Sequence, residues 1–176
     1  MKILFLIVFF SVVHASWTPV NFDKNISKYF GVWYVNAWTG NVDIPEDKRH
    51  QKIPPFIVRA LPNGKLEARL TLKKNGRCEE IKLTLEKTKE PGKMTTWGRQ
   101  IVGILSLRIE DQIIVYIESK MNGKNVIMME LAGRNVAAHP EAMKVFKQFV
   151  RSKGQDETKI IVPELEGNKD GFSNFS

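Results

Sequence analysis

The sequence has few of the residues on which metal centres, disulfide scaffolds and most catalytic sites depend. Its 176 residues include one cysteine, Cys78, and three histidines. A single cysteine excludes an intramolecular disulfide framework, and no Cys/His spacing is typical of a zinc site. The chain also lacks a glycine-rich phosphate loop and the G-x-S-x-G signature of hydrolases. We therefore expect no metal, no cofactor and no catalytic residue.

Long apolar runs are missing as well, except for one at the very start. Met1 and Lys2 precede an apolar stretch over residues 3–13, and the small residue Ala15 follows it. This pattern is typical of a secretory signal peptide, and the run is too short to cross a membrane. We expect residues 1–15 to be removed, no membrane span to remain, and the extracellular protein to begin near Ser16.

The charge is unbalanced towards basic residues. The chain has 27 Lys and Arg against 19 Asp and Glu, a formal net charge of +8. No basic run exceeds a pair such as Lys48-Arg49, and Lys and Arg alternate with apolar residues. This alternation is typical of the solvated outer face of a β-sheet, and it argues against a nucleic-acid partner.

Short strand-like segments follow one another through the middle of the chain. Residues 66–73 and 77–88 alternate apolar with polar side chains, and Asn75-Gly76 between them is a strong hairpin signal. The eight predicted strands cover residues 31–39, 53–61, 66–73, 77–88, 94–98, 100–107, 113–118 and 125–131. Sequential hairpins between so many antiparallel strands favour an up-and-down barrel over a sandwich.

One helix is predicted after these strands, over residues 140–153. It opens with Pro140 and ends at Gly154, and its apolar stripe suits packing against the outside of a barrel. A short ninth strand is predicted over residues 159–162, and a flexible tail over residues 167–176. We therefore expect an all-β domain over residues 16–166, an eight-stranded antiparallel up-and-down barrel with one C-terminal flanking helix.

Three stretches of the chain, in this order, resemble the lipocalin family. Gly31-Val32-Trp33 matches the G-x-W motif of the family, and Arg134 matches the arginine that packs over that tryptophan. Residues 140–154 match the flanking helix. The resemblance covers about residues 27–165, and the chain looks most like the odorant-binding, von Ebner's-gland and vomeronasal secretory branch. It implies a secreted carrier of a small hydrophobic ligand, in which Gly31, Trp33 and Arg134 are structural.

The chain departs from the pattern of that branch in two places. The T-D-Y motif of the family is here Asp111-Gln112-Ile113. The branch also joins a cysteine at the position of Cys78 to the C-terminal tail, but residues 164–176 contain no cysteine. We therefore expect Cys78 to be a free thiol or an intermolecular bridge, and the protein to be a monomer or a Cys78-linked dimer.

Alternation along the strands predicts which side chains face the interior. In a filled core these side chains would occupy the space, whereas the resemblance implies that they line a ligand cavity. The predicted inward residues are Phe56, Val58, Ala60, Leu66, Ala68, Leu70, Leu72, Ile81, Leu83, Leu85, Ile113, Val115, Ile117, Val126 and Met128. Gly98 and Gly103 interrupt the alternation over residues 94–107, so the orientation there stays open.

The same alternation also places one charged residue, Glu130, on the inward face. By alternation it shares a face with Val126 and Met128, at a position where the resembling branch often carries an inward lysine. Burial of an inward carboxyl would raise its pKa and favour neutral or amine-bearing ligands over acids. A shift of one residue in register would instead place Glu130 in solvent.

Two other functions are compatible with the sequence. A filled barrel could bind a receptor or an anionic surface through its basic exterior, with Val42 and Ile44 as an exposed apolar patch. An isomerase-like lipocalin could use Cys78 as a nucleophile, although no partnering base is evident. Separately, Asn25-Ile26-Ser27 is a possible N-glycosylation sequon.

Overall fold

The computed structural model of the chain describes residues 16–164, except residues 44, 50, 51, 75 and 98. The predicted signal peptide and the predicted tail over residues 167–176 lie outside the described residues. The strands are β1 (Trp17–Pro19), β2 (Gly31–Gly40), β3 (Phe56–Ala60), β4 (Leu66–Lys74), β5 (Arg77–Lys87), β6 (Lys93–Thr96), β7 (Gln100–Leu107), β8 (Gln112–Met121) and β9 (Lys124–Gly133). The α-helices are α1 (Glu46–Arg49) and α2 (Pro140–Ser152), and the 3₁₀ helices are η1 (Ile26–Tyr29), η2 (Pro62–Gly64) and η3 (Glu157–Lys159).

Strands β2 to β9 close into an antiparallel barrel. Their order is β7-β6-β5-β4-β3-β2-β9-β8, and an additional β7–β8 pairing joins the two ends of the sheet. The Asn122-Gly123 turn has φ angles of 50° and 78°, which two-residue hairpin turns require. The predicted eight-stranded barrel is confirmed, and β1, which pairs with β7, is an addition that was not predicted.

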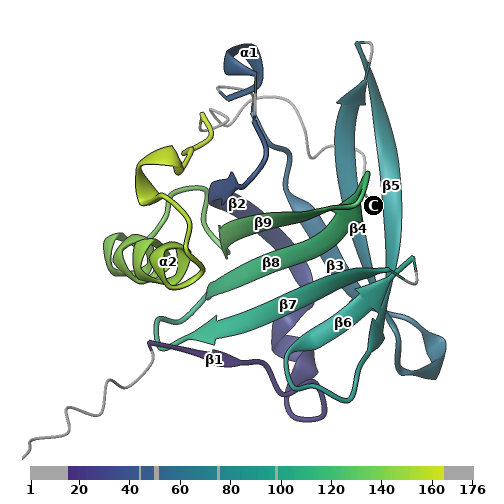
Figure 1. Cartoon of the computed structure of the whole chain (residues 1–176). Helices are drawn as coiled ribbons and strands as arrows, with labels where there is room; N and C mark the ends of the chain where they lie inside the picture. Colours follow the sequence, from purple (N-terminus) through teal and green to yellow (C-terminus); the bar gives the residue numbers. More distant parts are fainter. Residues whose placement is uncertain (1–15, 44, 50–51, 75, 98, 165–176) are drawn as a thin grey trace, which may run out of the picture.

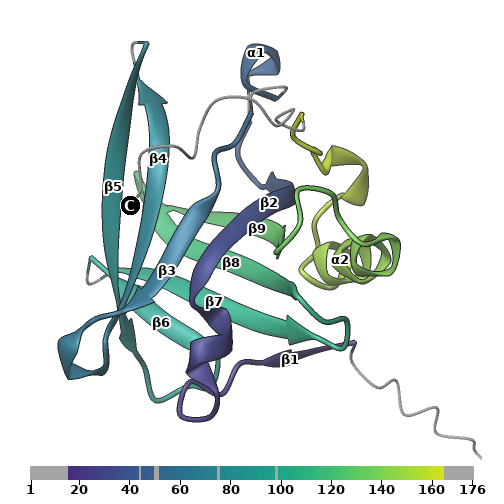
Figure 2. The same ribbon diagram turned by 180° about the vertical axis from the view of Figure 1, so that it is seen from behind.

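The two ends of the barrel are built differently. Figures 1 and 2 show α1 and the turn between β4 and β5 at one end, and η1 at the opposite end. Helix α2 lies outside the barrel, beside β2 and β9 in both views. Because the helix covers part of the outer surface, the sheet is packed on both of its faces there.

Two apolar clusters lie on opposite faces of the barrel wall. The interior cluster consists of Val20, Phe22, Tyr29, Trp33, Val58, Leu66, Leu85, Met94, Val102, Ile104, Ile113, Val115 and Ala132. The outer cluster, beneath α2, consists of Ala37, Leu105, Leu107, Ile114, Tyr116, Met129, Leu131, Ala142, Phe146, Phe149 and Val150. The predicted helix stripe is therefore used as expected, with Ala142 in addition and Met143 at its margin.

Local contacts and residue types define both ends of helix α2. The His139 side chain accepts a hydrogen bond from the Glu141 backbone N–H at 3.2 Å, which satisfies a free donor of the first turn. Pro140 occupies the first turn, and Gly154 follows the helix with a φ of 71°. The Lys144 Nζ lies 2.8 Å from the Glu141 carboxylate, one turn back along the exposed side.

The predicted ninth strand over residues 159–162 is wrong. Lys159 ends η3, whose first turn is capped by the Asp156 carboxylate, and Ile161 makes only an isolated bridge with Trp38. The capped turn keeps the chain off the edge of β2 until Ile161, so one pair of backbone hydrogen bonds forms, at 2.8 and 2.9 Å. Strand β3 likewise begins at Phe56, because Pro54 and Pro55 have no N–H to donate.

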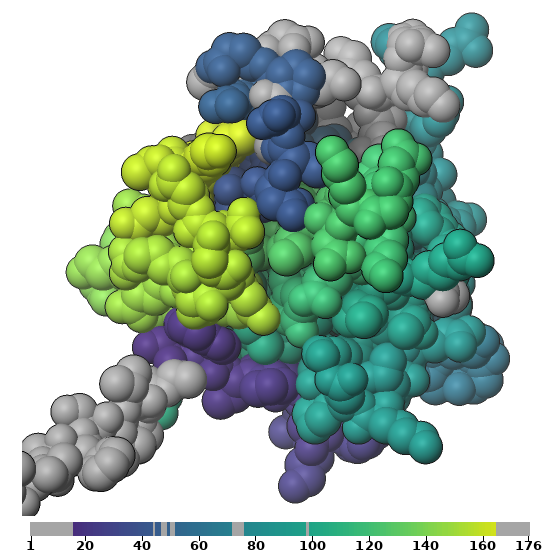
Figure 3. Space-filling model, in the orientation of Figure 1, coloured from purple at the N-terminus to yellow at the C-terminus, as the bar shows by residue number. Residues whose placement is uncertain are grey.

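The segment after α2 lies beside the loop that follows β2. Figure 3 shows this contact, with residues near 153–164 in yellow and residues just after 40 in blue. The Thr39 hydroxyl donates to the Lys159 carbonyl across it, at 3.4 Å. Within the described ranges, no helix has the length and apolar character needed to span a bilayer.

Candidate functional site

The barrel is closed at the end that carries η1. The Trp33 side chain is 2% exposed, and the Arg134 guanidinium lies 3.8 Å from the centre of its ring. Arg134 also donates to the carbonyls of Lys28, Phe30 and Val32, each at 2.7 Å. Through these three hydrogen bonds and the ring contact, Trp33 and Arg134 hold the closed end together.

Gly31 belongs to the same structural unit. Its φ is 95°, in the left-handed region that favours glycine, and a Cβ here would lie 3.4 Å from an Arg134 nitrogen. The Trp33 indole N–H donates to the Tyr29 carbonyl at 2.8 Å, which ties η1 to the start of β2. These contacts of Gly31, Trp33 and Arg134 all join η1 to β2 and to the end of β9, which is a structural role.

The predicted inward residues fall into two groups along the barrel. Val58, Leu66, Leu85, Ile113 and Val115 are buried in the interior cluster, with Phe56, Ala68 and Ile117 packed against it. A second group keeps some accessible surface although strand pairing places it on the same face: Leu70, Ile81, Leu83, Val126 and Met128. Ala60 shares that face but is exposed at the strand end, and the Leu72 side chain is outside the described residues.

The second group is informative because its members face inward without being fully covered. A solid core would bury them as completely as it buries Leu66, at 3% exposed. Leu70 and Ile81 lie towards the β4–β5 turn, and Met128 pairs with Gly40 at the end of β2. The interior is therefore most completely packed at the Trp33 end, and its apolar side chains keep more accessible surface towards the other end.

Glu130 points into this interior. It lies opposite Val115 of the interior cluster, while its neighbours Met129 and Leu131 belong to the outer cluster. The register shift that would place Glu130 in solvent is therefore excluded. Burial raises its pKa from the usual 4.5 to about 7, because an apolar environment disfavours the charged form.

Trp38 is an interior residue that sequence analysis missed. Strand β2 contains a β-bulge between Val35 and Ala37, so Val35 lies opposite Ala132 whereas Trp38, three residues later, lies opposite Glu130. Simple alternation from Trp33 places Trp38 on the wrong face. The available signal was Asn36, a polar residue within an apolar strand, whose buried amide donates to the carbonyls of Asn135 and Val136 at 2.9 Å.

Strands β6 and β7, whose orientation the sequence left open, contribute Met94, Val102 and Ile104 to the interior. Gly103 faces outward, where the Tyr116 ring of β8 covers it. A Cβ built at Gly103 would lie 1.9 Å from that ring. The glycine that interrupts the alternation is thus required by the close approach of a neighbouring aromatic side chain.

Comparison with known proteins agrees with this geometry. The family described as the lipocalin / cytosolic fatty-acid binding protein family matches residues 30–166. The chain belongs to the lipocalin family. The match includes the Trp33–Arg134 closure, the barrel strands β2 to β9 and helix α2.

Several known proteins are similar to this chain over most of their length. The major allergen Can f 1 of Canis lupus familiaris is 35% identical, over 94% of this chain and 96% of its own. Odorant-binding protein 2a of Mus musculus is 32% identical, over 78% and 79% of the two chains. A solved structure of the siderocalin Ex-FABP has a TM-score of 0.70 at 21% identity, covering 80% of this chain and 97% of its own, which supports the fold.

Cys78 lies outside the interior of this lipocalin. It is a free, exposed cysteine that pairs with Lys73 next to the β4–β5 turn. Its neighbour Glu79 lies opposite Leu72, on the inward side of the ladder, so Cys78 belongs to the outer face. A thiol there cannot attack a ligand held inside the barrel, which removes the basis of the isomerase-like alternative.

On the outer face around β3, β4 and β5, charged side chains form ion pairs. Glu67 accepts from Arg59 at 2.7 Å and from Arg69 at 2.5 Å, and hydrogen bonding from Arg69 and then Arg59 lowers the pKa of Glu67. Glu86 accepts from Lys65 in the next row. In this part of the outer face, Arg59, Arg69 and Lys65 therefore face carboxylates, which interrupts the basic charge.

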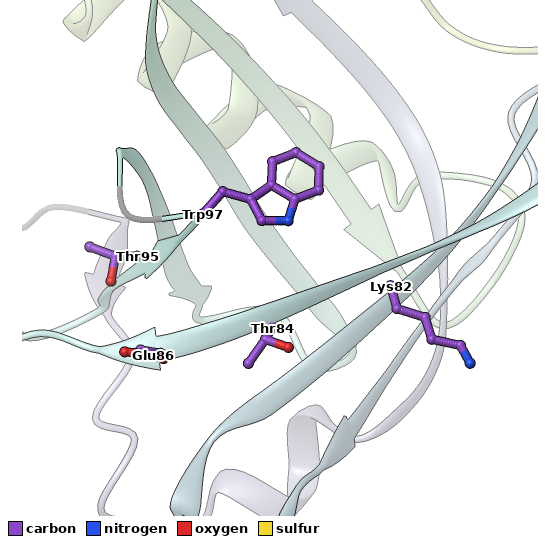
Figure 4. Close-up of a pocket in the computed structure, with 5 residues that line it drawn as sticks. All are labelled: Lys82, Thr84, Glu86, Thr95 and Trp97. Carbon is purple, nitrogen blue, oxygen red and sulfur yellow. The ribbon is translucent and has the colours of Figure 1, made fainter.

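A surface pocket of about 280 Å³ lies on the outer face between β5 and β6. Figure 4 shows its lining side chains: Lys82, Thr84 and Glu86 of β5, Thr95 of β6, and Trp97 just after β6. Apart from Trp97, which is 65% exposed, the lining is polar or charged. This pocket is less suited to an apolar ligand than the barrel interior.

Proposed function

We propose that this lipocalin is a secreted carrier that binds a small hydrophobic ligand, such as an odorant, a pheromone or a lipid-like molecule, inside the barrel. The observation that supports it is the group of apolar, inward yet partly accessible side chains above the Trp33 floor. One similar protein is named an odorant-binding protein. The proposed ligand contacts are Phe56, Val58, Leu66, Ala68, Leu70, Ile81, Leu83, Leu85, Ile113, Val115, Ile117, Val126, Met128 and Glu130.

Binding in such a site is driven by burial of apolar surface. Each Å² of apolar area removed from water contributes about 25 cal/mol, and loss of ligand freedom and ordering of side chains offset part of it. A ligand of about ten to fifteen carbons is then expected to bind with micromolar affinity. No bond is made or broken, so the residues act by shape and polarity alone.

Displacement of a fluorescent apolar probe tests the proposal and locates the site. The native protein is expected to bind the probe at one site, and 1-decanol to displace it. Ala68→Phe fills the interior and should weaken probe binding at least about tenfold, since it replaces ligand volume with side chain. Thr84→Phe adds the same ring to the outer pocket and should leave binding unchanged.

The same measurement separates the carrier from the interaction-protein alternative. A filled barrel would bind no probe, and a probe lost in Thr84→Phe but kept in Ala68→Phe would move the site to the outer face. Val42 is 39% exposed and suits either a lid or a contact patch, while Ile44 lies outside the described residues. Thermal unfolding of each variant shows that a loss of binding is not a loss of fold.

Secretion and processing are parts of the same proposal. Expression in a secreting cell should release a chain that begins near Ser16, which intact mass of the medium protein measures. The same spectrum reports use of the sequon at Asn25, an exposed residue at the start of η1. Brief proteolysis should trim residues 167–176 without loss of probe binding, and lost binding would contradict a flexible tail.

A further inference from the structure

Glu130 and Trp38 form a polar spot beside the apolar inward residues Val115 and Met128. They are directly opposed across the β2–β9 ladder, and Glu130 is also opposite the interior residue Val115. All three therefore lie on the inward face. Directly opposed side chains on antiparallel strands have Cβ atoms about 4.5–5.5 Å apart, so Trp38 and Glu130 are immediate neighbours on the inward face.

Neither polar group is satisfied within the described part of the chain. The Trp38 Nε1 atom is buried and donates no hydrogen bond. Burial alone accounts for the raised pKa of Glu130, with no hydrogen bond or charge of a described residue contributing to it. A buried donor such as the Trp38 N–H nearly always has a partner in native proteins, and the neighbouring Glu130 carboxylate is an acceptor that keeps some accessible surface.

We propose that Glu130 and Trp38 bind the headgroup of an amphiphilic amino alcohol, a ligand with a primary amine and a neighbouring hydroxyl at one end of an apolar chain. The ammonium donates to the Glu130 carboxylate, and the hydroxyl oxygen accepts from the Trp38 indole N–H. The apolar chain then lies along the inward side chains of the barrel. The inference rests on the proposed carrier function and names its ligand class.

Among the side chains that the structure describes on the inward face, no other charge compensates Glu130. Lys87, at the closed end, is 3.0 Å from the Asp23 carboxylate and also donates to the Phe22 carbonyl. Lys124 is exposed at the start of β9, and Arg77 and Glu79 are exposed beside the β4–β5 turn. The facing stretches of β2 and β8, around Trp38 and Val115, carry no charged residue on this face.

This arrangement sorts ligands by headgroup. An amine supplies the cation that Glu130 lacks, and charge-assisted hydrogen bonds are the stronger ones. A plain alcohol satisfies only one of the two groups. A carboxylate placed beside Glu130 meets a like charge, which selects against acids of equal length.

Four ten-carbon competitors of the fluorescent probe test the subsite on the full-length mature chain at about pH 8. We expect 2-amino-1-decanol to bind at least about tenfold more tightly than 1-decanol, decylamine to lie between them, and decanoic acid to be weakest. Glu130→Gln should remove about tenfold of affinity from both amines and change 1-decanol by less than about threefold. Trp38→Phe should remove the advantage of the amino alcohol over decylamine.

A matched control is available on the neighbouring strand. Glu118 lies opposite Ile127 on the outer side of the barrel wall, so Glu118→Gln removes the same charge without touching the interior. It should leave all four affinities unchanged. The indole N–H proton signal of Trp38, assigned by its loss in Trp38→Phe, should shift when 2-amino-1-decanol binds.

The outcomes separate the subsite from the carrier function. If 1-decanol binds but the amines gain nothing from Glu130, or lose equally in Glu118→Gln, the subsite is refuted and the carrier stands. If no competitor and no probe binds the native protein, the carrier function is refuted and the subsite with it. Amine selectivity without a shift of the Trp38 signal refutes the role of Trp38.

Discussion

Around residues 128–131 of strand β9, the outer side chains are more completely buried than the inner ones. This is the reverse of a barrel wall whose outside faces solvent. On the outer face, Met129 and Leu131 are 0% exposed beneath Phe146 and Phe149 of α2. On the inner face, Met128 and Glu130 keep accessible surface although they point into the protein. The better-packed face is the outside, because the helix covers it.

This contrast separates stability from function within a single strand. Tight packing on the outer face contributes dispersion and hydrophobic free energy that every folded molecule retains. Looser packing on the inner face gives up part of that free energy, as the proposed binding of a ligand there requires. Substitutions on the two faces should therefore have different consequences even where the chemistry of the change is the same.

The largest expected effect comes from a matched pair of neighbouring methionines. Met129→Ala leaves a cavity in the packed outer cluster and should lower the free energy of unfolding by about 2–5 kcal/mol. Met128→Ala shortens a side chain that keeps accessible surface, so it should lower the free energy of unfolding by about 1 kcal/mol or less. It should also change ligand affinity. Chemical denaturation of both variants measures the difference, and equal losses would mean that the two faces are packed alike.

The next effect depends on pH and on Glu130. Between pH 4.5 and about 7 the folded carboxyl keeps a proton that the unfolded one has lost, so the free energy of unfolding falls as the pH rises through this window. Above about 7 the loss is complete and the slope vanishes. Glu130→Gln should match the native protein near pH 4.5 and exceed its stability by up to about 3 kcal/mol near pH 8.

Denaturation at several pH values measures this difference. A gap between Glu130→Gln and the native protein that stays constant across the window would show that Glu130 ionises normally in the folded state. Bound amine should narrow the gap at high pH, because it favours the charged carboxylate.

A smaller effect is expected when a larger side chain is introduced on the outer or the inner face of the barrel wall. Gly103→Ala drives a methyl group into the Tyr116 ring on the outer face and should cost about 1–3 kcal/mol through overpacking. Ala68→Val adds two methyl groups to the inner face and should cost less than about 1 kcal/mol while disfavouring the bulkiest ligands. Comparable losses for both substitutions would show that the interior has no spare volume.

The smallest effect is expected at Cys78, which belongs to neither packed face. Cys78→Ser should change the free energy of unfolding by no more than about 0.5 kcal/mol, as for other surface positions. In the folded native protein one thiol per chain should react with a thiol reagent without denaturant. A slow or absent reaction, together with a doubled mass on a non-reducing gel, would instead identify an intermolecular bridge.

Much of the fold could be predicted because its signals are local. The Asn122-Gly123 turn, the alternation over residues 66–88 and the stripe of α2 each depend on a few consecutive residues, and the structure contains all three. Glu130 was oriented correctly for the same reason, since β9 alternates without a bulge. Trp38 was missed and a strand over residues 159–162 was wrongly predicted, because a bulge and a single-residue bridge depend on the neighbouring strand.

The sequence by itself determined the number and order of the barrel strands, the G-x-W closure and the two faces of β9. Turn residues and alternating side chains act within a few residues of the chain, so they leave a direct record in it. Only the tertiary structure decided that α2 covers the outer face of β9 and that Trp38 lies opposite Glu130. Barrel closure and the bulge at Asn36 set those neighbours, and both arise from hydrogen bonds between segments about a hundred residues apart.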